Sequence, residues 1–289
     1  MRLSLALITA LFMIGALVSC KTTETESDMN IIFLHHSTGR ILWKGEAPSF
    51  ASKVAGRISS KLGNNADQKG QIPDMLKAYN KENGKNYRIE ERIFPKAEPY
   101  GWHNYPYDYY NIWVKNAGDQ PIMEEPTLEI LSKDYQVIIF KHCFPVSTVQ
   151  ADQDSADINS DLKTLGNYKL QYAALKDKLH EFPETKFILF TGAALTESSV
   201  SEDKAMRARE FFEWVKNEWD APGDNIYIWD LHELQTEGGL YFLDEYANSP
   251  SDSHPNVDFA KSAGSLFFNR IIDVIENNGN GTQLTGKAL

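Results

Sequence analysis

The sequence predicts an α/β fold in three layers, with helices on both faces of a parallel sheet of about five strands. Short apolar runs that are continuous instead of alternating indicate strands covered on both faces. Helical stretches lie between these runs, and such alternation is typical of right-handed crossover units on a parallel sheet. With 289 residues, of which 42% are hydrophobic, the chain is long enough for one domain of this kind.

Five apolar runs are the predicted strands. They cover residues 30–35, 87–94, 136–140, 186–190 and 225–229. Three helices are predicted from apolar residues spaced three or four apart. These series are Tyr168, Tyr172, Leu175, Leu179 and Phe182; Ala208, Phe212, Val215 and Trp219; and Phe259, Ala263, Phe267, Ile271 and Val274. Asn256 is the expected N-cap of the last helix and Gly279 follows its end. No internal repeat divides residues 30–289, which we expect to form a single domain.

The N-terminus has the features of an export signal. Residues 1–19 contain Arg2, an apolar run too short for a typical membrane span and a small-residue cleavage site. The residues Leu17-Val18-Ser19-Cys20 resemble the bacterial lipobox, in which the cysteine becomes the lipidated first residue; the alternative is a generic signal peptide with a chance cysteine. Residues 20–29 lack bulky apolar side chains beyond Met29 and predict a flexible tether. Lys21 stands where an aspartate would retain a lipoprotein in the inner membrane. By resemblance to the enterobacterial sorting rule, we expect the outer membrane or cell surface, with the lipid as the only membrane contact.

Charge and cysteine content exclude several classes of protein. Lys and Arg total 29 against 40 Asp and Glu, so the net charge is −11. Such a chain has no basic field for nucleic acid phosphates. Cys20 and Cys143 are the two cysteines, which are too few for a disulfide framework or a four-thiolate zinc site.

The carboxyl ends of parallel strands are where α/β proteins place their sites. Ser37 follows the first predicted strand, where a strand-to-helix turn exposes its hydroxyl and helix N–H groups can stabilise negative charge. Asp252 and His254 lie in a polar turn before the last helix. Such an imidazole can take the proton of the serine while the carboxylate fixes its tautomer. The alternatives are that Ser37 caps the following helix and that Asp252 belongs to a solvated turn.

These blocks together resemble the SGNH hydrolase superfamily, whose GDSL-type members carry Ser in the first block and Asp-x-x-His in the last. The resemblance implies a flavodoxin-like fold, with Ser37 as nucleophile, His254 as general base and Asp252 as its orienting acid. Three departures stand out. The first block reads His35-His36-Ser37-Thr38 where the family has Gly-Asp-Ser-Leu. One residue instead of two separates Asp252 from His254, and residues 141–144 replace the block that supplies an asparagine.

The same resemblance implies the oxyanion donors. The backbone N–H groups of Ser37 and Gly101 are the expected oxyanion donors. His36, Trp102 and His142 are the expected substrate contacts.

Other polar groups allow two interpretations each. Imidazole and carboxylate groups that suit zinc or manganese are present at His35, His36, His232, His254, Asp230 and Asp252. No ligand spacing supports a metal, and the alternative is that His35 and His36 are hydrogen-bonded turn residues; we predict no metal and no cofactor. Cys143, beside His142, is either a nucleophile or a buried structural thiol, and adjacent residues on an extended segment point apart, which favours the thiol.

The segment from Tyr100 to Trp113 holds eight aromatic side chains, His103 included, in fourteen residues. It is either a platform that stacks on sugar rings or a long loop without regular structure that anchors itself by aromatic packing.

Three classes of function follow from these patterns. The preferred one is an exported serine esterase that hydrolyses an O-acyl ester, such as acetyl on a polysaccharide or a small molecule, through an acyl-enzyme and without a cofactor. The second is a surface lipoprotein that binds glycan without catalysis. The third is metal-dependent hydrolysis.

Overall fold

A five-stranded parallel sheet forms the centre of the computed structural model, which describes residues 29–46, 69–153 and 155–289. The predicted signal peptide and the lipidation site Cys20 lie outside these residues. The strands are β1 (Met29–His35), β2 (Tyr87–Ile93), β3 (Val137–Phe140), β4 (Lys186–Phe190) and β5 (Ile226–Trp229). Their order is β2-β1-β3-β4-β5, the flavodoxin-like order. The predicted fold class is confirmed, and each strand end lies within one residue of its prediction.

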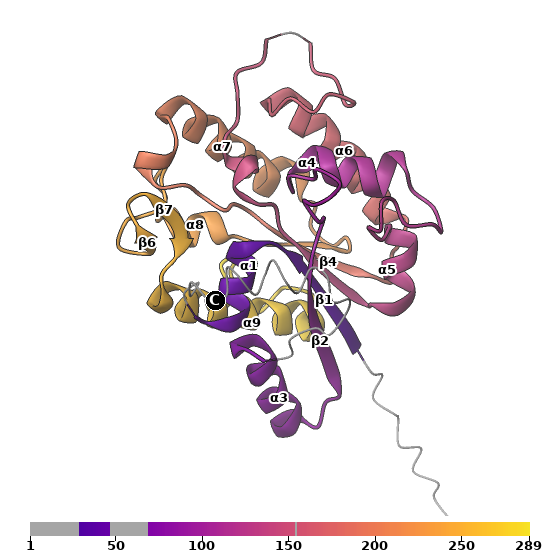
Figure 1. Cartoon of the computed structure of the whole chain (residues 1–289). Coiled ribbons are helices and arrows are strands. Elements are labelled where there is room, and N and C mark those ends of the chain that lie inside the picture. The colour runs from indigo at the N-terminus through magenta and orange to yellow at the C-terminus, as the bar shows by residue number, and fades with distance from the viewer. Residues whose placement is uncertain (1–28, 47–68, 154) are drawn as a thin grey trace, which may run out of the picture.

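Helices cover both faces of the sheet, as Figure 1 shows. One face is covered by α4 (Pro106–Tyr109), the π-helix η1 (Tyr110–Lys115), α5 (Leu128–Asp134), α6 (Leu165–His180), α7 (Glu202–Trp214) and the π-helix η4 (Val215–Trp219). The other face is covered by α1 (Ser37–Lys44), α3 (Gln71–Asn83), α8 (Leu231–Thr236) and α9 (Val257–Asn277). Alternate side chains of β1 divide between the two layers, so the continuous apolar run of this strand fills both cores.

Shorter elements complete the chain at the edge of the sheet where the strands end. They are the 3₁₀ helices η2 (Phe144–Ser147) and η3 (Glu197–Ser199) and the antiparallel hairpin of β6 (Ala247–Ser249) and β7 (Asp252–Pro255). Within the described residues, no helix combines the length and the apolar character needed to cross a membrane.

The predicted helices are present, with three differences. Phe182 lies beyond the end of α6, and the apolar series of α7 continues into the wider turns of η4. The aromatic segment is helical, as α4 and η1, instead of a loop without regular structure. Its buried rings, Tyr105, Tyr109 and Trp113, recur every four residues, which is a helical spacing.

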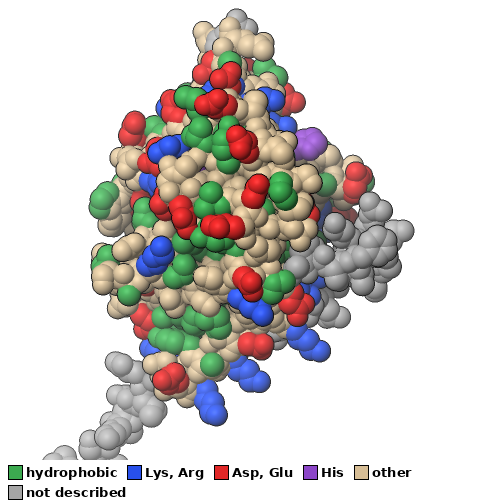
Figure 2. All heavy atoms as spheres, turned by 90° about the vertical axis from the view of Figure 1, so that its left-hand side faces the viewer, with side chains coloured by type: hydrophobic (Ala, Val, Ile, Leu, Met, Phe, Trp, Pro, Cys, Tyr) green, Lys and Arg blue, Asp and Glu red, His purple; other side chains and the backbone are tan. Residues whose placement is uncertain are grey.

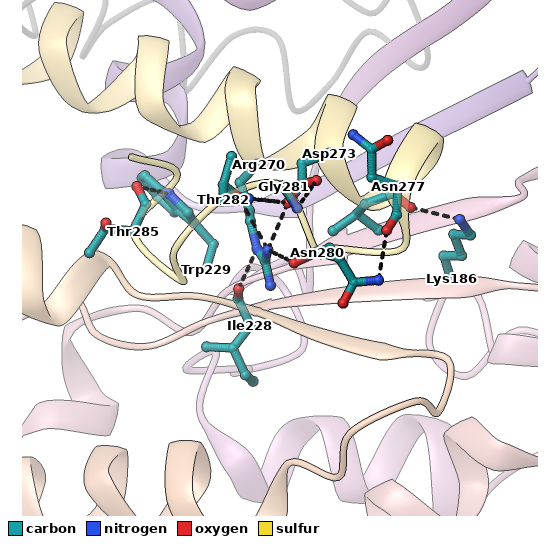
Figure 3. Close-up of polar contacts among 12 residues, drawn as sticks. Lys186, Ile228, Trp229, Arg270, Asp273, Asn277, Asn280, Gly281, Thr282 and Thr285 are labelled. Atoms are coloured by element: carbon teal, nitrogen blue, oxygen red, sulfur yellow. Dashed lines mark hydrogen bonds and ion pairs between the residues drawn. The ribbon is translucent and has the colours of Figure 1, made fainter. Parts of the chain in front are cut away.

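The last helix and the segment after it are held by hydrogen bonds. The Asn256 side chain accepts the Phe259 N–H (2.9 Å), which confirms it as the N-cap of α9. Arg270 of α9 is 4% exposed and donates to Asp273 (3.1 Å) and to the carbonyls of Ile228 (3.0 Å) and Gly279 (2.8 Å) (Figure 3).

The C-terminal segment also covers β5. The Trp229 indole donates to the carbonyl of Thr285 (3.0 Å), and the Asp230 N–H donates to the carbonyl of Leu284 (2.9 Å). The segment therefore lies along one edge of the sheet.

Candidate active site

Ser37, His254 and Asp252 meet at the edge of the sheet where β1 ends. The Ser37 Oγ lies 2.9 Å from the His254 Nε2, although 217 positions separate them in the sequence. The other ring nitrogen of His254, Nδ1, lies 2.6 Å from the Asp252 Oδ1. Folding therefore joins the three predicted residues in one hydrogen-bonded chain.

The contacts fix the protonation pattern of this chain. A carboxylate accepts hydrogen bonds, so the Nδ1–H of His254 donates to Asp252 and leaves Nε2 to accept the Ser37 hydroxyl proton. Burial raises the pKa of Asp252, but hydrogen bonds from His254 and Asn248 outweigh it and hold the pKa below its ordinary value. Asp252 is therefore charged at neutral pH, and an imidazole held this way is ready to remove a proton from Ser37.

The hairpin explains the one-residue spacing of Asp252 and His254. Both lie on β7, and alternate residues of a strand point to the same face. Ser253, between them, points inward, where its hydroxyl accepts the Thr196 N–H (3.0 Å). The interpretation of this segment as a solvated turn is therefore wrong: a short strand delivers both groups.

Ser37 does not act as a helix cap. It is the first residue of α1, whose N-cap is His36 without a capping side chain. The first helical bond runs from the Arg40 N–H to the His36 carbonyl (3.1 Å), so the N–H groups of Ser37, Thr38 and Gly39 lie at the open end of the helix. These donors, together with the positive end of the helix dipole, can stabilise an oxyanion beside Ser37.

Two histidines hold the serine turn in place. The His35 Nδ1 lies 2.8 Å from the His36 carbonyl, and the His36 Nε2 donates to the Pro95 carbonyl (2.6 Å). Burial lowers the pKa of His36 to about 4, so its ring is neutral. His35 packs beneath α1, where a Cβ at Gly39 would lie 2.4 Å from the His35 Cβ. The interpretation of both histidines as hydrogen-bonded turn residues is confirmed.

The prediction that Gly101 supplies a second oxyanion donor is wrong. Its N–H donates to the Ala97 carbonyl (2.5 Å). Nearby N–H groups are also engaged, because His103 and Asn104 donate to Asp108 (2.7 and 2.6 Å). These three backbone N–H groups of the loop after β2 therefore donate within the loop and to α4, and not to a substrate.

Two predicted substrate contacts are buried. His142 is 0% exposed, with its ring against Tyr109 and its Nε2 2.5 Å from the Tyr172 hydroxyl. Burial and then the charge of Lys141 hold the pKa of His142 well below its ordinary value. Trp102 is 8% exposed and belongs to the same core. These two predictions are wrong because the apolar layer over this face takes in both rings, whereas His36 is half-buried directly beside Ser37.

The aromatic segment acts mainly in packing. Five of its rings are at most 8% exposed: Trp102, Tyr105, Tyr109, Tyr110 and Trp113. Their contacts include Phe94 and Phe140 at the ends of β2 and β3. The interpretation as a sugar-stacking platform is wrong for these five rings.

Phe144 is a site residue that the sequence analysis missed. Its ring meets the His254 imidazole edge to face, with centroids 5.1 Å apart and planes at 77°. The signal was its place just after β3, at the edge that carries the site. Cys143, which precedes it, is a free and half-buried thiol. Among the described residues, no group of three or more His, Cys, Asp or Glu side chains is placed to hold a metal ion.

The surface beside the hairpin is acidic. A groove of about 810 Å³ there is lined by Glu233, Glu237, Glu245 and Asp258, with Lys287 at the same groove. Figure 2 shows acidic side chains spread over this side of the molecule. The local potential therefore disfavours anionic ligands.

The fold and the site define a flavodoxin-like α/β domain with a Ser-His-Asp arrangement at the carboxyl edge of its sheet. No family model matches the chain, and no curated protein matches its sequence. One solved structure to which it is similar is a carbohydrate esterase whose active site displays divergent catalytic and non-catalytic binding functions. The two share 15% identity with a TM-score of 0.38, over 85% of this chain and 65% of that one, so this chain spans about two thirds of the length of that protein.

Proposed function

We propose that the chain is a serine ester hydrolase that removes a short O-acyl group, such as acetyl, from a polysaccharide or a smaller alcohol. The observation that carries the proposal is the hydrogen-bonded chain from the Ser37 Oγ through His254 to Asp252. An exposed serine gains nucleophilic strength from a base in this position. The departures from the SGNH pattern concern the residues around Ser37, the oxyanion donors and the spacing of Asp252 and His254. They leave the two hydrogen bonds that join Ser37, His254 and Asp252 in place.

The proposed reaction has two halves. His254 Nε2 takes the proton of the Ser37 hydroxyl while its Oγ bonds to the ester carbonyl carbon, and the N–H groups of the first turn of α1 stabilise the oxyanion. The C–O bond to the alcohol then breaks, and His254 returns the proton to the leaving oxygen. Water, deprotonated by His254, releases the acid from the acyl-enzyme and restores Ser37.

The surroundings of the site favour a bulky, uncharged alcohol. Ser37 is exposed, and the side chains of His254 and Asp252 are 24% and 28% exposed, so a large substrate reaches the nucleophile without entering a deep cavity. The acidic groove beside the hairpin disfavours anionic polymers. The N-terminal sequence supports the cell envelope as the place of action, with Cys20 as the lipid anchor.

The test is labelling and turnover. Wild type is expected to react with a fluorophosphonate probe and to hydrolyse p-nitrophenyl acetate and acetylated xylan. Ser37→Ala should lose labelling and at least about 10³-fold in kcat. Ser251→Ala, a change at an exposed serine of the hairpin turn, is the matched control and should keep both.

The other outcomes point to the other classes. A wild type that binds acetylated xylan but neither labels nor hydrolyses any short ester contradicts the proposal and indicates glycan binding. Hydrolysis that a chelator abolishes and Ser37→Ala leaves intact indicates metal-dependent chemistry. We expect a chelator to leave the rate unchanged.

A further inference from the structure

Lys141 is a buried cation directly after β3, beside the turn that carries Ser37. Its N–H donates to the Leu34 carbonyl (3.2 Å), which places its backbone next to the end of β1. Its side chain is 0% exposed, and its Nζ donates to the carbonyl of His142 (2.6 Å). Within the described part of the chain, no carboxylate lies within 4.0 Å of this ammonium group.

This arrangement weakens the fold. An ammonium group has three donors, and one carbonyl accepts from Lys141. Burial lowers the pKa of Lys141 to about 8, so the group is still mainly charged at neutral pH. A buried charge without an ionic partner is destabilising, whereas an apolar side chain of the same length would pack there without that cost.

The His142 carbonyl, which accepts from Lys141, is at the start of the segment that leads to Phe144. The next N–H, of Cys143, donates to the Asn104 carbonyl (2.9 Å). Phe144 follows, and its ring lies against the imidazole of His254. Three consecutive residues therefore connect the ammonium group to the catalytic base of the proposed reaction.

His254 needs such support. Its ring bonds to Ser37 and Asp252 in its own plane, and its side chain is 24% exposed. Hydrogen bonds in the ring plane do little to stop the imidazole from tilting out of that plane. The ring of Phe144 contacts it from the side, at 77°.

We propose that Lys141 is a positioning residue for His254: its ammonium group fixes the His142 carbonyl and so holds Phe144 against the imidazole. This inference rests on the proposed function for its kinetic consequence, but the position of the ring is measurable without it.

The kinetic test compares Lys141→Met, Phe144→Leu and the double variant. Each single change should lower kcat about tenfold and change KM less than twofold. The double variant should be no slower than the slower single variant, because both changes release the same contact. Lys186→Met is the matched control, since Lys186 begins the neighbouring strand and donates to the Val274 carbonyl (2.6 Å) at the end of α9; its kcat should equal that of wild type.

The structural test is the NMR signal of the His254 ring protons, which the ring current of Phe144 shifts. Lys141→Met and Phe144→Leu should move this signal in the same direction, and Lys186→Met should not. If Lys141→Met lowers kcat while the signal stays in place, the positioning role is overturned and the charge acts directly on the site. If Lys141→Met changes neither kcat nor the His254 signal, the positioning role is overturned as well.

The two proposals fail differently. A wild type without esterase activity, in which Lys141→Met still moves the His254 signal, contradicts the proposed function and supports the positioning role. Multiplicative losses of kcat in the double variant contradict the positioning role while leaving the esterase intact.

Discussion

Arg270 and Lys141 are both buried cations, but their surroundings differ. Arg270 donates to Asp273, Thr282 and two backbone carbonyls. Burial raises the pKa of Asp273, but hydrogen bonds from Thr282 and Gly281 and then the charge of Arg270 bring it below its ordinary value. The ammonium group of Lys141 donates to one acceptor, the His142 carbonyl. The first cluster satisfies its polar groups, whereas the second leaves a cation underpartnered beside the candidate nucleophile.

This fold gains stability at the cluster of Arg270 and gives stability up at Lys141. A fully partnered cluster stabilises, and removal of one member leaves an uncompensated charge. An underpartnered group at a site persists when it serves chemistry instead of folding. Changes near Ser37 should therefore lower the rate without lowering the stability, and changes near Arg270 should lower the stability without lowering the rate.

The largest expected effect is on the rate, at Asp252→Asn. The amide cannot hold the His254 tautomer as the carboxylate does, so kcat for p-nitrophenyl acetate should fall about 10³ to 10⁴-fold, or about 4–5 kcal/mol in the barrier. The free energy of unfolding should change by less than about 1 kcal/mol. Asp244→Asn, at an exposed aspartate before the hairpin, is the control. If Asp244→Asn lost as much kcat as Asp252→Asn, or if Asp252→Asn lost none, Asp252 would not be a catalytic residue.

The next effect is on stability, at Arg270→Met. The change strands the buried Asp273 carboxylate, so the free energy of unfolding should fall by about 3–5 kcal/mol, measured by urea denaturation. The kcat per folded molecule should stay at the wild-type value. Arg209→Met, at an exposed arginine of α7, should change stability by less than about 0.5 kcal/mol. A loss of rate in folded Arg270→Met would contradict the division between the two regions.

The third prediction has the opposite sign. Lys141→Met should raise the free energy of unfolding by about 1–3 kcal/mol at pH 7, because it removes a buried charge with an incomplete set of partners. The pKa of Lys141 is lowered to about 8 in the folded state from 10.5, so the unfolded state binds more protons between these values and wild-type stability rises with pH there.

The advantage of Lys141→Met should therefore shrink as the pH rises from about 8 to about 10.5. Urea denaturation of both proteins across this range measures it. The groups that face Lys141 are His36 from the turn after β1, Tyr109 from α4, and His142 and Cys143 from its own segment. If the difference in unfolding free energy between Lys141→Met and wild type stayed constant with pH, the ammonium charge would not be the cause of that difference.

The smallest effect, on stability, is expected at Asn256, which lies between β7 of the candidate site and α9, the helix that carries Arg270. Asn256→Ala removes the cap of α9 and should cost about 1 kcal/mol of unfolding free energy, with kcat reduced less than threefold. Asn256→Ser keeps a capping oxygen and should recover most of the loss. Thermal and urea unfolding of the two variants decide this, and a large loss of rate in Asn256→Ala would extend the site into α9.

The sequence predicted the sheet and its long helices well because buried parallel strands leave continuous apolar runs. Val137–Phe140 is wholly apolar and fully buried. The hairpin was missed for the converse reason: Asp252–Pro255 is a short polar strand without the β-branched or aromatic residues that mark strands. The helix of the aromatic segment was missed although Tyr105, Tyr109 and Trp113 have helical spacing.

The candidate site was predicted in its residue types but not in its details. Ser37, His254 and Asp252 were found from their places relative to strands and helices, which sequence patterns encode. Gly101 and His142 failed because the engagement of an N–H group, or the face a ring takes, depends on contacts from distant segments. The contact of Phe144 with His254 joins η2 to β7, more than a hundred residues apart, and no local pattern reports it.

The C-terminal segment along β5 has a consequence for self-association. An exposed edge strand is a template on which another chain can add a strand, and here the Leu284 carbonyl accepts the Asp230 N–H just beyond the end of β5. Deletion of residues 279–289 would uncover this edge and also remove two acceptors of Arg270, the Gly279 carbonyl and the Thr282 hydroxyl, so a shortened protein should aggregate through this edge. Fusion partners and immobilisation tags are therefore better joined through a flexible spacer after Leu289 than grafted into the segment itself.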